Sequence, residues 1–388
     1  MATRKPISLL KGKENVAETY PDEPTRFTEE EVDPFLLWCV KKNSSDITIQ
    51  SDRFVYNEIN GTLYPATLRP LDPADMAVFL SRIYGPDALA RLASGKDLDV
   101  SYEIRPDRYN RHRFRVNITA IQSKGRDAAQ ITMRVMPDIP PTMEDLNIED
   151  DIIRAWSPRQ GMVIITGPTG SGKTTLLAAG NRMLLERRHG CGKMLTYEAP
   201  IEYVYDKIKT RRSVVAQSEI PRHLPDFAAG VRNALRRKPN IILVGEARDT
   251  ETISAAIEAS QTGHLVYTTT HTIGVAATIS RMISTYDHSE REERALALME
   301  TVRMVVTQAL VPKRSGGRMG VREWMRFPDE VRERLMEMSY EKWAAEIQRL
   351  LPRYGQTMQK SAALVFDKGL IERRHYLLLA LATGAGGQ

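Results

Sequence analysis

The chain has 388 residues, of which 42% are apolar and 27% are charged, a composition typical of soluble globular proteins. Its length exceeds what one ordinary core holds, so we expect two or three domains. The two cysteines, Cys39 and Cys191, exclude a disulfide framework and a cysteine metal site, and they suit a reducing cytoplasm. No apolar run approaches the ~20 residues that a membrane helix needs, so we expect no membrane insertion. The net charge of +6 is compatible with a nucleic-acid or acidic-membrane partner, but a phosphate-binding enzyme also carries positive charge, and a mildly basic soluble protein is the favoured interpretation.

The N-terminal third predicts an α+β domain. Residues 1–25 mix charges and prolines without periodicity and predict a mobile arm. Thr28 and Glu31 form a capping box before a first helix, and Asp72 with Pro73 begins a second. Between the two helices, the stretches 45–50 and 57–64 alternate with period two and predict strands.

A hairpin closes this domain and places two arginines side by side. Residues 113–120 and 130–135 alternate around a Lys124–Gly125 turn, so Arg115 and Arg134 share the polar face of the hairpin. Prolines then interrupt the sheet, and residues 137–148 predict a short semi-rigid hinge between domains.

The stretch 161–175 predicts a nucleotide-binding loop. An apolar strand leads into the pattern G-x-x-x-x-G-K-[ST], and a helix follows, which is the context that this pattern requires. The glycines let backbone N–H groups approach phosphates, Lys173 reaches the β- and γ-phosphates, and the hydroxyl of Thr174 is a ligand for Mg²⁺. The predicted ATP-binding residues are Gly167, Pro168, Thr169, Gly170, Ser171, Gly172, Lys173, Thr174 and Thr175.

Strands and helices alternate from about 145 to 312, which favours a mostly parallel α/β sheet. The expected strands are rich in Val, Ile, Leu and Thr, as strands buried on both faces should be. They are 163–166, 193–197, 214–217, 241–244 and 265–269. Beyond a hairpin at 309–324, helical periodicity continues to about 383. The domains that we expect are therefore an arm at 1–25, an N-terminal domain at 26–136, a hinge at 137–148, an ATPase domain at 149–312 and a C-terminal hairpin and helical unit at 313–388.

Acidic residues and histidines stand at the ends of these strands, where parallel strands converge on a bound nucleotide. Glu246 follows a buried strand and a glycine, which predicts that it orients the attacking water rather than only capping the next helix. Glu198 closes another strand, where it would position the nucleophile or contact Mg²⁺ through water, whereas Glu202 is equally compatible with a surface role. Of the two histidines around 265–269, His271 is the better candidate for sensing the γ-phosphate, and the role of His264 stays open.

Together these motifs resemble the PilT-like superfamily of secretion and pilus-retraction ATPases. The P-loop, Y-E-A-P-I-E, G-E-A-R-D-T-E-T and T-G-H-L-V-Y-T-T-T-H-T correspond in order and spacing to its Walker A, Asp, Walker B and His boxes. The stretches 217–225 and 231–239 resemble its DotB/TraJ branch, which serves type IVB secretion and conjugation. Two departures are Ala199, where an Asp is usual, so that more weight falls on Glu198, and Thr270, where Leu is common.

The resemblance implies a RecA-like P-loop ATPase core behind a PAS-like N-terminal domain, in a homo-hexamer that uses ATP and Mg²⁺. It implies that Arg115 and Arg134 reach the nucleotide as the hinge closes, and it leaves the roles of Arg232, Arg236 and Arg248 open. It also implies a cytoplasmic enzyme recruited to an inner-membrane secretion or conjugation complex through a partner ATPase, without direct nucleic-acid binding.

We therefore expect an ATP-driven motor for type IVB secretion or conjugation. The alternatives are a pilus-retraction motor of the same superfamily, a nucleic-acid translocase and a scaffold that binds ATP without hydrolysing it. A translocase needs stacking aromatics along its basic segments, which this sequence does not interleave, and Glu246 argues against a scaffold. What the motor moves, whether protein effectors, a DNA–protein complex or a pilus, stays open.

Overall fold

The structure is a computed structural model that describes residues 19–59, 61–108 and 110–382. The chain divides between Asp138 and Ile139 into two compact units, which correspond to separate hydrophobic cores. In the part of the chain that is described, no helix has the length and apolar character needed to cross a bilayer.

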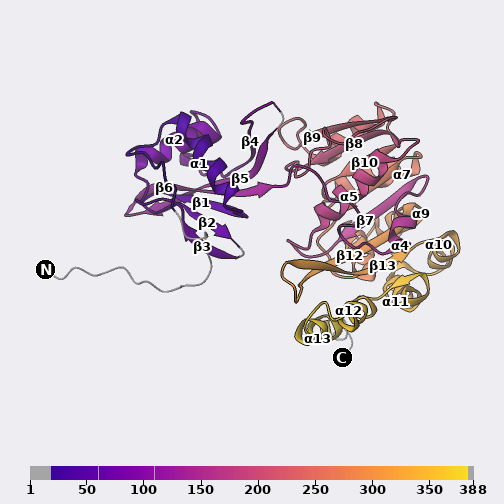
Figure 1. Cartoon of the computed structure of the whole chain (residues 1–388). Helices are drawn as coiled ribbons and strands as arrows, with labels where there is room; N and C mark the ends of the chain where they lie inside the picture. Colours follow the sequence, from indigo (N-terminus) through magenta and orange to yellow (C-terminus); the bar gives the residue numbers. More distant parts are fainter. Residues whose placement is uncertain (1–18, 60, 109, 383–388) are drawn as a thin grey trace. The chain divides into compact units, whose positions relative to one another are not determined.

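The first unit is an antiparallel six-stranded sheet in the order β3-β2-β1-β6-β5-β4, with helices on one face (Figure 1). Its strands are β1 (Asp46–Gln50), β2 (Tyr56–Ile59), β3 (Thr62–Pro65), β4 (Leu98–Ile104), β5 (His112–Ser123) and β6 (Arg126–Met136). Its helices are α1 (Glu29–Lys41), α2 (Pro73–Ile83) and α3 (Ala88–Ala93). Phe114, Val116 and Ile118 of β5 are fully buried in the core, as their alternation predicts.

Both predicted helix starts are confirmed. The backbone N–H of Thr28 donates to Glu31 at 2.7 Å, and the backbone N–H of Asp75 donates to Asp72 at 2.9 Å. These side chains satisfy amide groups that a helix leaves unpaired at its first turn. The predicted arm lies mostly outside the described residues, but Tyr20 near its end is buried and packs edge-on against Phe35. From that tyrosine on, the chain is therefore part of the first core.

The second unit is an eight-stranded sheet in the order β14-β13-β12-β7-β11-β10-β8-β9. Its strands are β7 (Gly161–Thr166), β8 (Gly192–Glu198), β9 (Ser213–Glu219), β10 (Ile241–Val244), β11 (Leu265–Thr269), β12 (Val302–Pro312), β13 (Arg318–Arg326) and β14 (Gly355–Gln356). Its helices are α4 (Asp150–Ala155), α5 (Lys173–Glu186), α6 (Phe227–Leu235), α7 (Thr250–Gln261), α8 (Val275–Ser284), α9 (Arg291–Thr301), α10 (Asp329–Met336), α11 (Trp343–Tyr354), α12 (Met358–Asp367) and α13 (Arg373–Ala382), with a short 3₁₀ turn, Tyr340–Lys342, before α11. The five strands expected at 163–269 are all present.

The strands from β12 to β9 all run parallel, and helices cover both faces of the sheet. In β7 the two faces can be read residue by residue, because Met162 and Ile164 belong to one hydrophobic cluster and Val163 and Ile165 to the other. Burial on both sides explains why these strands are continuous apolar runs. The predicted fold class, a RecA-like α/β core with an α+β N-terminal domain and C-terminal helices, is confirmed.

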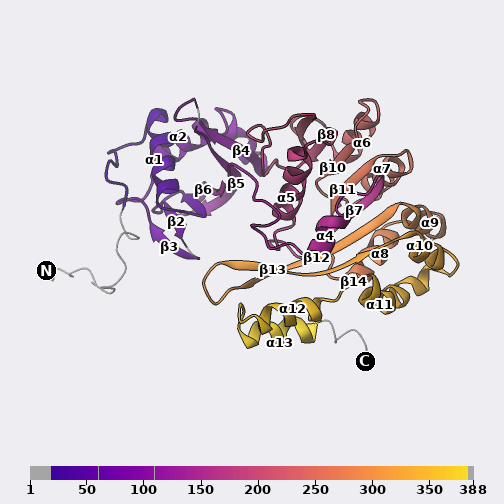
Figure 2. The ribbon, with the colours of Figure 1, turned by 45° about the vertical axis from the view of Figure 1, so that its right-hand side comes forward.

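The hairpin after residue 309 is longer than the sequence suggests, and it belongs to the main sheet. β12 pairs with β7 and β13 pairs antiparallel with β12, so the sheet extends beyond the predicted ATPase segment. Figure 2 shows this hairpin reaching out from the sheet beside α12 and α13. At the other end of the segment, Met143 and Ile148 of the predicted hinge are buried in the core of the second unit.

Candidate functional site

The loop between β7 and α5 has the backbone shape of a phosphate cradle. Gly167, Gly170 and Gly172 all have positive φ angles, and Gly172 caps α5 in the left-handed conformation. A Cβ on Gly167 would lie 2.3 Å from the backbone oxygen of Gln308, so only glycine fits at that position. The loop therefore leads directly into the positive end of a helix of 14 residues, where backbone N–H groups favour an anion.

Lys173 is held inside this loop. Its side chain is mostly buried, and its Nζ donates to the backbone oxygens of Gly167 at 2.8 Å and Pro168 at 3.1 Å. Burial lowers the pKa of Lys173, while the carboxylates of Glu246 and Glu202 act in the opposite direction. The two backbone oxygens that accept from Lys173 are neutral and therefore weak partners for a buried ammonium group. An anionic phosphate would be a much better partner.

Glu246 and His271 meet at Lys173, although they come from different strand ends. Glu246 follows β10 and His271 follows β11, the strand between β10 and the P-loop strand β7. The Nδ1 atom of His271 lies 3.3 Å from Lys173 Nζ, and its Nε2 lies 3.5 Å from Glu246 Oε1. Because the ammonium can only donate, Nδ1 is the acceptor and the proton of a neutral His271 sits on Nε2, facing Glu246. One imidazole therefore links the lysine and the carboxylate.

The two carboxylates of the stretch 198–202 have different surroundings. Glu198 is buried, and its Oε1 accepts from Thr196 Oγ1 at 2.6 Å and from Gln217 Nε2 at 3.1 Å. Glu202 is only partly buried and contributes to the electrostatic environment of Lys173. The sequence placed more weight on Glu198, whereas the electrostatics link Glu202 to Lys173 of the P-loop.

The hydroxyl groups of the loop also differ. Thr175 Oγ1 lies 3.1 Å from the hydroxyl of Tyr203, and Thr174 is partly exposed at the first turn of α5. Ser171 Oγ is buried, and the described residues offer it no hydrogen-bond partner. A buried hydroxyl without a partner is unfavourable, and here it lies in a loop shaped for phosphate.

A buried polar chain that the sequence did not reveal supports the loop from behind. Gln308 of β12 donates to the backbone oxygen of Ser171 at 2.7 Å and accepts from Nε of Arg322 at 2.8 Å. The Arg322 side chain is almost fully buried, and it also donates to Glu149 at 3.0 Å and to the backbone oxygens of Leu146 and Asn147. We call Gln308, Arg322 and Glu149 the P-loop brace. A lone arginine in a strand usually indicates an exposed position, so no local signal could have identified it.

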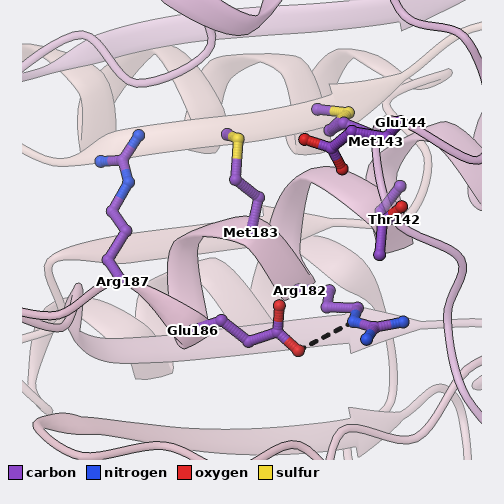
Figure 3. Close-up of a pocket in the computed structure, with 8 residues that line it drawn as sticks. Thr142, Met143, Glu144, Arg182, Met183, Glu186 and Arg187 are labelled. Atoms are coloured by element: carbon purple, nitrogen blue, oxygen red, sulfur yellow. Dashed lines mark hydrogen bonds and ion pairs between the residues drawn. The ribbon is translucent and has the colours of Figure 1, made fainter.

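A second contact ties α5 to the segment after the first unit. Arg182 donates to the backbone oxygen of Pro140 at 2.6 Å and to Glu186 at 2.9 Å. These side chains border a cavity of about 180 Å³ together with Thr142, Met143, Glu144, Ala179, Met183 and Arg187 (Figure 3). The helix that begins at Lys173 is therefore fastened near its other end to the start of the second unit.

Arg115 and Arg134 lie in the first unit, directly opposite each other on β5 and β6. Like charges in this arrangement repel, and Arg134 is partly neutralised by Asp46 at 2.9 Å. The shared polar face is as the alternation predicts. His264, by contrast, has a local role, because its Nδ1 lies 3.0 Å from the backbone oxygen of Ala259 at the end of α7.

Comparison with known proteins agrees with this geometry. The family of type II/IV secretion system proteins matches residues 114–370. The type IV pilus retraction ATPase PilT of Pseudomonas aeruginosa is 31% identical over 345 residues, which are 89% of this chain and 96% of PilT. The X-ray structure of the Legionella pneumophila ATPase DotB is 47% identical with a TM-score of 0.84, over 95% of this chain and all of DotB. A crystal structure of PilT with bound ADP is 27% identical with a TM-score of 0.77, over 90% of this chain and 96% of PilT.

The family match covers well over half of the chain, and the DotB and PilT likenesses extend across nearly all of it. The P-loop with its buried lysine supplies the nucleotide site that such enzymes require. The chain is therefore a nucleotide-binding ATPase that belongs to the type II/IV secretion system protein family, within the PilT-like superfamily of secretion ATPases.

Proposed function

We propose that the chain forms a homo-hexameric ring that hydrolyses ATP to drive type IVB secretion or conjugative transfer. The observation that carries this proposal is the joining of Lys173, His271 and Glu246 beside a P-loop, in a chain that resembles DotB along nearly its whole length. The ring works in the cytoplasm, recruited to the inner-membrane machinery through a partner ATPase.

ATP and Mg²⁺ fit the residues of the loop. The glycine backbone, Lys173 and the unpartnered hydroxyl of Ser171 offer donors to the phosphates of ATP. Thr174, partly exposed at the start of α5, would hold Mg²⁺, which neutralises charge on the β- and γ-phosphates when bound.

Glu246 is the residue that we assign to the attacking water. Its carboxylate accepts a hydrogen bond from the water, whose oxygen forms a bond to the γ-phosphorus as the bond to the bridging oxygen of ADP breaks. Glu202 acts on the electrostatic environment of Lys173 and is the second carboxylate of the site. Glu198 is buried, and its hydrogen-bonding capacity is used by Thr196 and Gln217.

His271 reports the presence of the γ-phosphate. When Lys173 turns from the backbone oxygens of Gly167 and Pro168 toward a phosphate, its contact with His271 changes, and so does the hold of His271 on Glu246. The imidazole thereby links the bound state of the loop to the position of the catalytic carboxylate.

We assign the coupling of ATP hydrolysis to movement of the first unit to two arginines of its sheet and to α5 of the second unit. Arg115 and Arg134 lie opposite each other on β5 and β6, and in this proposal the negative charge of the γ-phosphate draws their two guanidinium groups toward the site. Arg182 fastens α5 to Pro140, which passes a shift of the loop on to the linker between the two units.

A pilus-retraction motor is the second candidate, since PilT of Pseudomonas aeruginosa matches most of the chain. Both motors share the site, so they differ in the complex that they join. Cross-linking in the native cell envelope, followed by identification of the partner, would separate them.

The catalytic part of the proposal is tested with two variants of the purified ring. Lys173→Ala should abolish nucleotide binding, because the loop loses its cation, whereas Glu246→Gln should bind ATP and not turn it over. Phosphate release and binding of a fluorescent ATP analogue are measured for both. Full turnover by Glu246→Gln would reject the assigned role, and strong stimulation of the unaltered ring by a polynucleotide would favour a nucleic-acid translocase.

A further inference from the structure

Three basic segments lie at the amino ends of strands in the second sheet, whereas the P-loop follows the carboxyl end of a strand. They precede the neighbouring parallel strands β8, β9 and β10, and they comprise residues 187–191, 207–212 and 236–240. Residues 207–212 are the last part of the connection between β8 and β9, directly after Asp206, and the three segments together contain nine Lys and Arg side chains and no Asp or Glu. We call these three segments the basic edge. Figure 1 shows the strands that they precede, β8, β9 and β10, next to one another on the β9 side of the sheet.

Direct contacts hold the loops together as one surface. The backbone N–H of Cys191 donates to Ser213 Oγ at 2.9 Å, directly after Arg212. Lys193 Nζ donates to the backbone oxygen of Arg237 at 2.7 Å, and its own N–H donates to Asn240 at 2.9 Å. Lys193, in β8 just after the first loop, thus joins the third loop to the start of that strand.

Five of the nine cations form no ion pair with a carboxylate in the part of the chain that the structure describes. Arg188, Lys209, Arg211, Arg212 and Lys238 are exposed, and among the described residues none of the five takes part in an ion pair. By comparison, most arginines of the first sheet and of α10 and α11 are paired with Asp or Glu. Unpaired like charges gathered on one surface create a positive potential that attracts an anionic partner.

The basic edge borders an open strand. Among the described residues, β9 is the last strand of the sheet and pairs with β8 alone, so alternate backbone groups of β9 point away from the sheet. Next to Arg211 and Arg212, the side chain of Val214 is 63% exposed. This surface therefore offers backbone hydrogen bonds and an apolar contact as well as charge.

Exposed cations, open backbone groups and an apolar side chain together distinguish three classes of anionic partner. A nucleic acid uses charge and aromatic stacking, and the three loops contain no Phe, Tyr or Trp. A lipid surface uses charge alone and gains nothing from an open strand. A protein segment in extended conformation uses charge, backbone and alternate side chains together. We propose that the basic edge binds an acidic protein segment, which adds as a strand to the open side of β9 and places carboxylates against Arg211 and Arg212.

The test uses the full chain and a labelled synthetic peptide of about 12 residues that alternates Glu and Val. Binding is followed by fluorescence anisotropy at low ionic strength, beside poly-glutamate of equal charge, single-stranded DNA and vesicles with an anionic phospholipid. We expect the alternating peptide to bind, and Arg211→Glu with Arg212→Glu to weaken it by about tenfold or more, since two contacts become repulsive. The matched control is Arg314→Glu with Arg318→Glu, which makes the same change of charge at the exposed tip of the β12–β13 hairpin and should stay within about twofold.

Basal ATP hydrolysis and thermal unfolding of both double variants should match those of the unaltered chain, because the basic edge is at the amino ends of the strands and the P-loop follows a carboxyl end. Equal binding of poly-glutamate and the alternating peptide would reject strand addition. Edge-dependent binding of DNA or of vesicles in place of the peptide would overturn the choice of partner. The proposal is also rejected if the peptide does not bind, or if Arg211→Glu with Arg212→Glu leaves its binding unchanged. The cations would then serve only to prevent edge-to-edge aggregation.

Discussion

Replacing Arg322 by methionine tests whether the P-loop brace supports the nucleotide site. Methionine keeps most of the buried length of the side chain and removes its donors. The variant loses the bond to Gln308 at 2.8 Å, the pair with Glu149 at 3.0 Å and two longer bonds to the backbone oxygens of Leu146 and Asn147. Gln308 then keeps its bond to Ser171, but its amide oxygen loses the hydrogen bond from Arg322 that helps to orient it.

The expected loss of stability follows from these bonds. A neutral hydrogen bond contributes about 1 kcal/mol and one to a charged group about 2 kcal/mol, while the variant no longer buries a guanidinium. Because the Glu149 side chain is 26% exposed, water can replace part of its lost partner. We expect Arg322→Met to lower the free energy of unfolding of the second unit by about 2–4 kcal/mol, or its Tm by about 5–12 °C.

Two assays and one control make this prediction decisive. Thermal unfolding measures the loss of stability, and titration with a fluorescent ATP analogue well below the Tm should show affinity weakened by about tenfold. Arg326→Met is the matched control, because Arg326 lies on the same strand but is exposed, and it should change stability by less than about 0.5 kcal/mol. If Arg322→Met unfolds and binds nucleotide as the unaltered chain does, or if the control loses as much, the brace does not support the loop.

Four further substitutions, compared in three experiments, test the carboxylates, the hairpin arginine and the packing of α5. Glu202→Gln should lower the rate of ATP hydrolysis more than Glu198→Gln, because the charge of Glu202 acts on Lys173. Steady-state phosphate release compares the two variants. The reverse ranking would support the role that the sequence assigned to Glu198. Arg134→Ala should reduce kcat by at least about tenfold with little change in Tm, since its exposed pair with Asp46 contributes little stability, and an unchanged kcat would remove it from the site. Gly180→Ala should destabilise the second unit despite the better helix propensity of alanine, because the added Cβ would lie 2.1 Å from the buried ring of Trp156; a higher Tm in thermal unfolding would contradict this packing.

Local patterns were enough to predict much of the fold and the core of the candidate site. The Thr28 capping box and the five parallel strands depend on residues close together in the chain, and so does the P-loop with Lys173. The opposition of Arg115 and Arg134 could also be predicted, because a tight turn and strict alternation determine which residues of a hairpin face each other. These features need no knowledge of distant segments.

The tertiary structure alone decided which distant side chains meet. Strand order brings His271 against Lys173 across 98 positions, and it brings Gln308 against Ser171 across 137. It also decided that Arg322 is buried and that Arg211 and Arg212 stand on an open edge, although arginines look alike in sequence. Whether a charge is buried, paired or left exposed depends on what the fold packs against it, and periodicity along one segment carries no information about its neighbours in space.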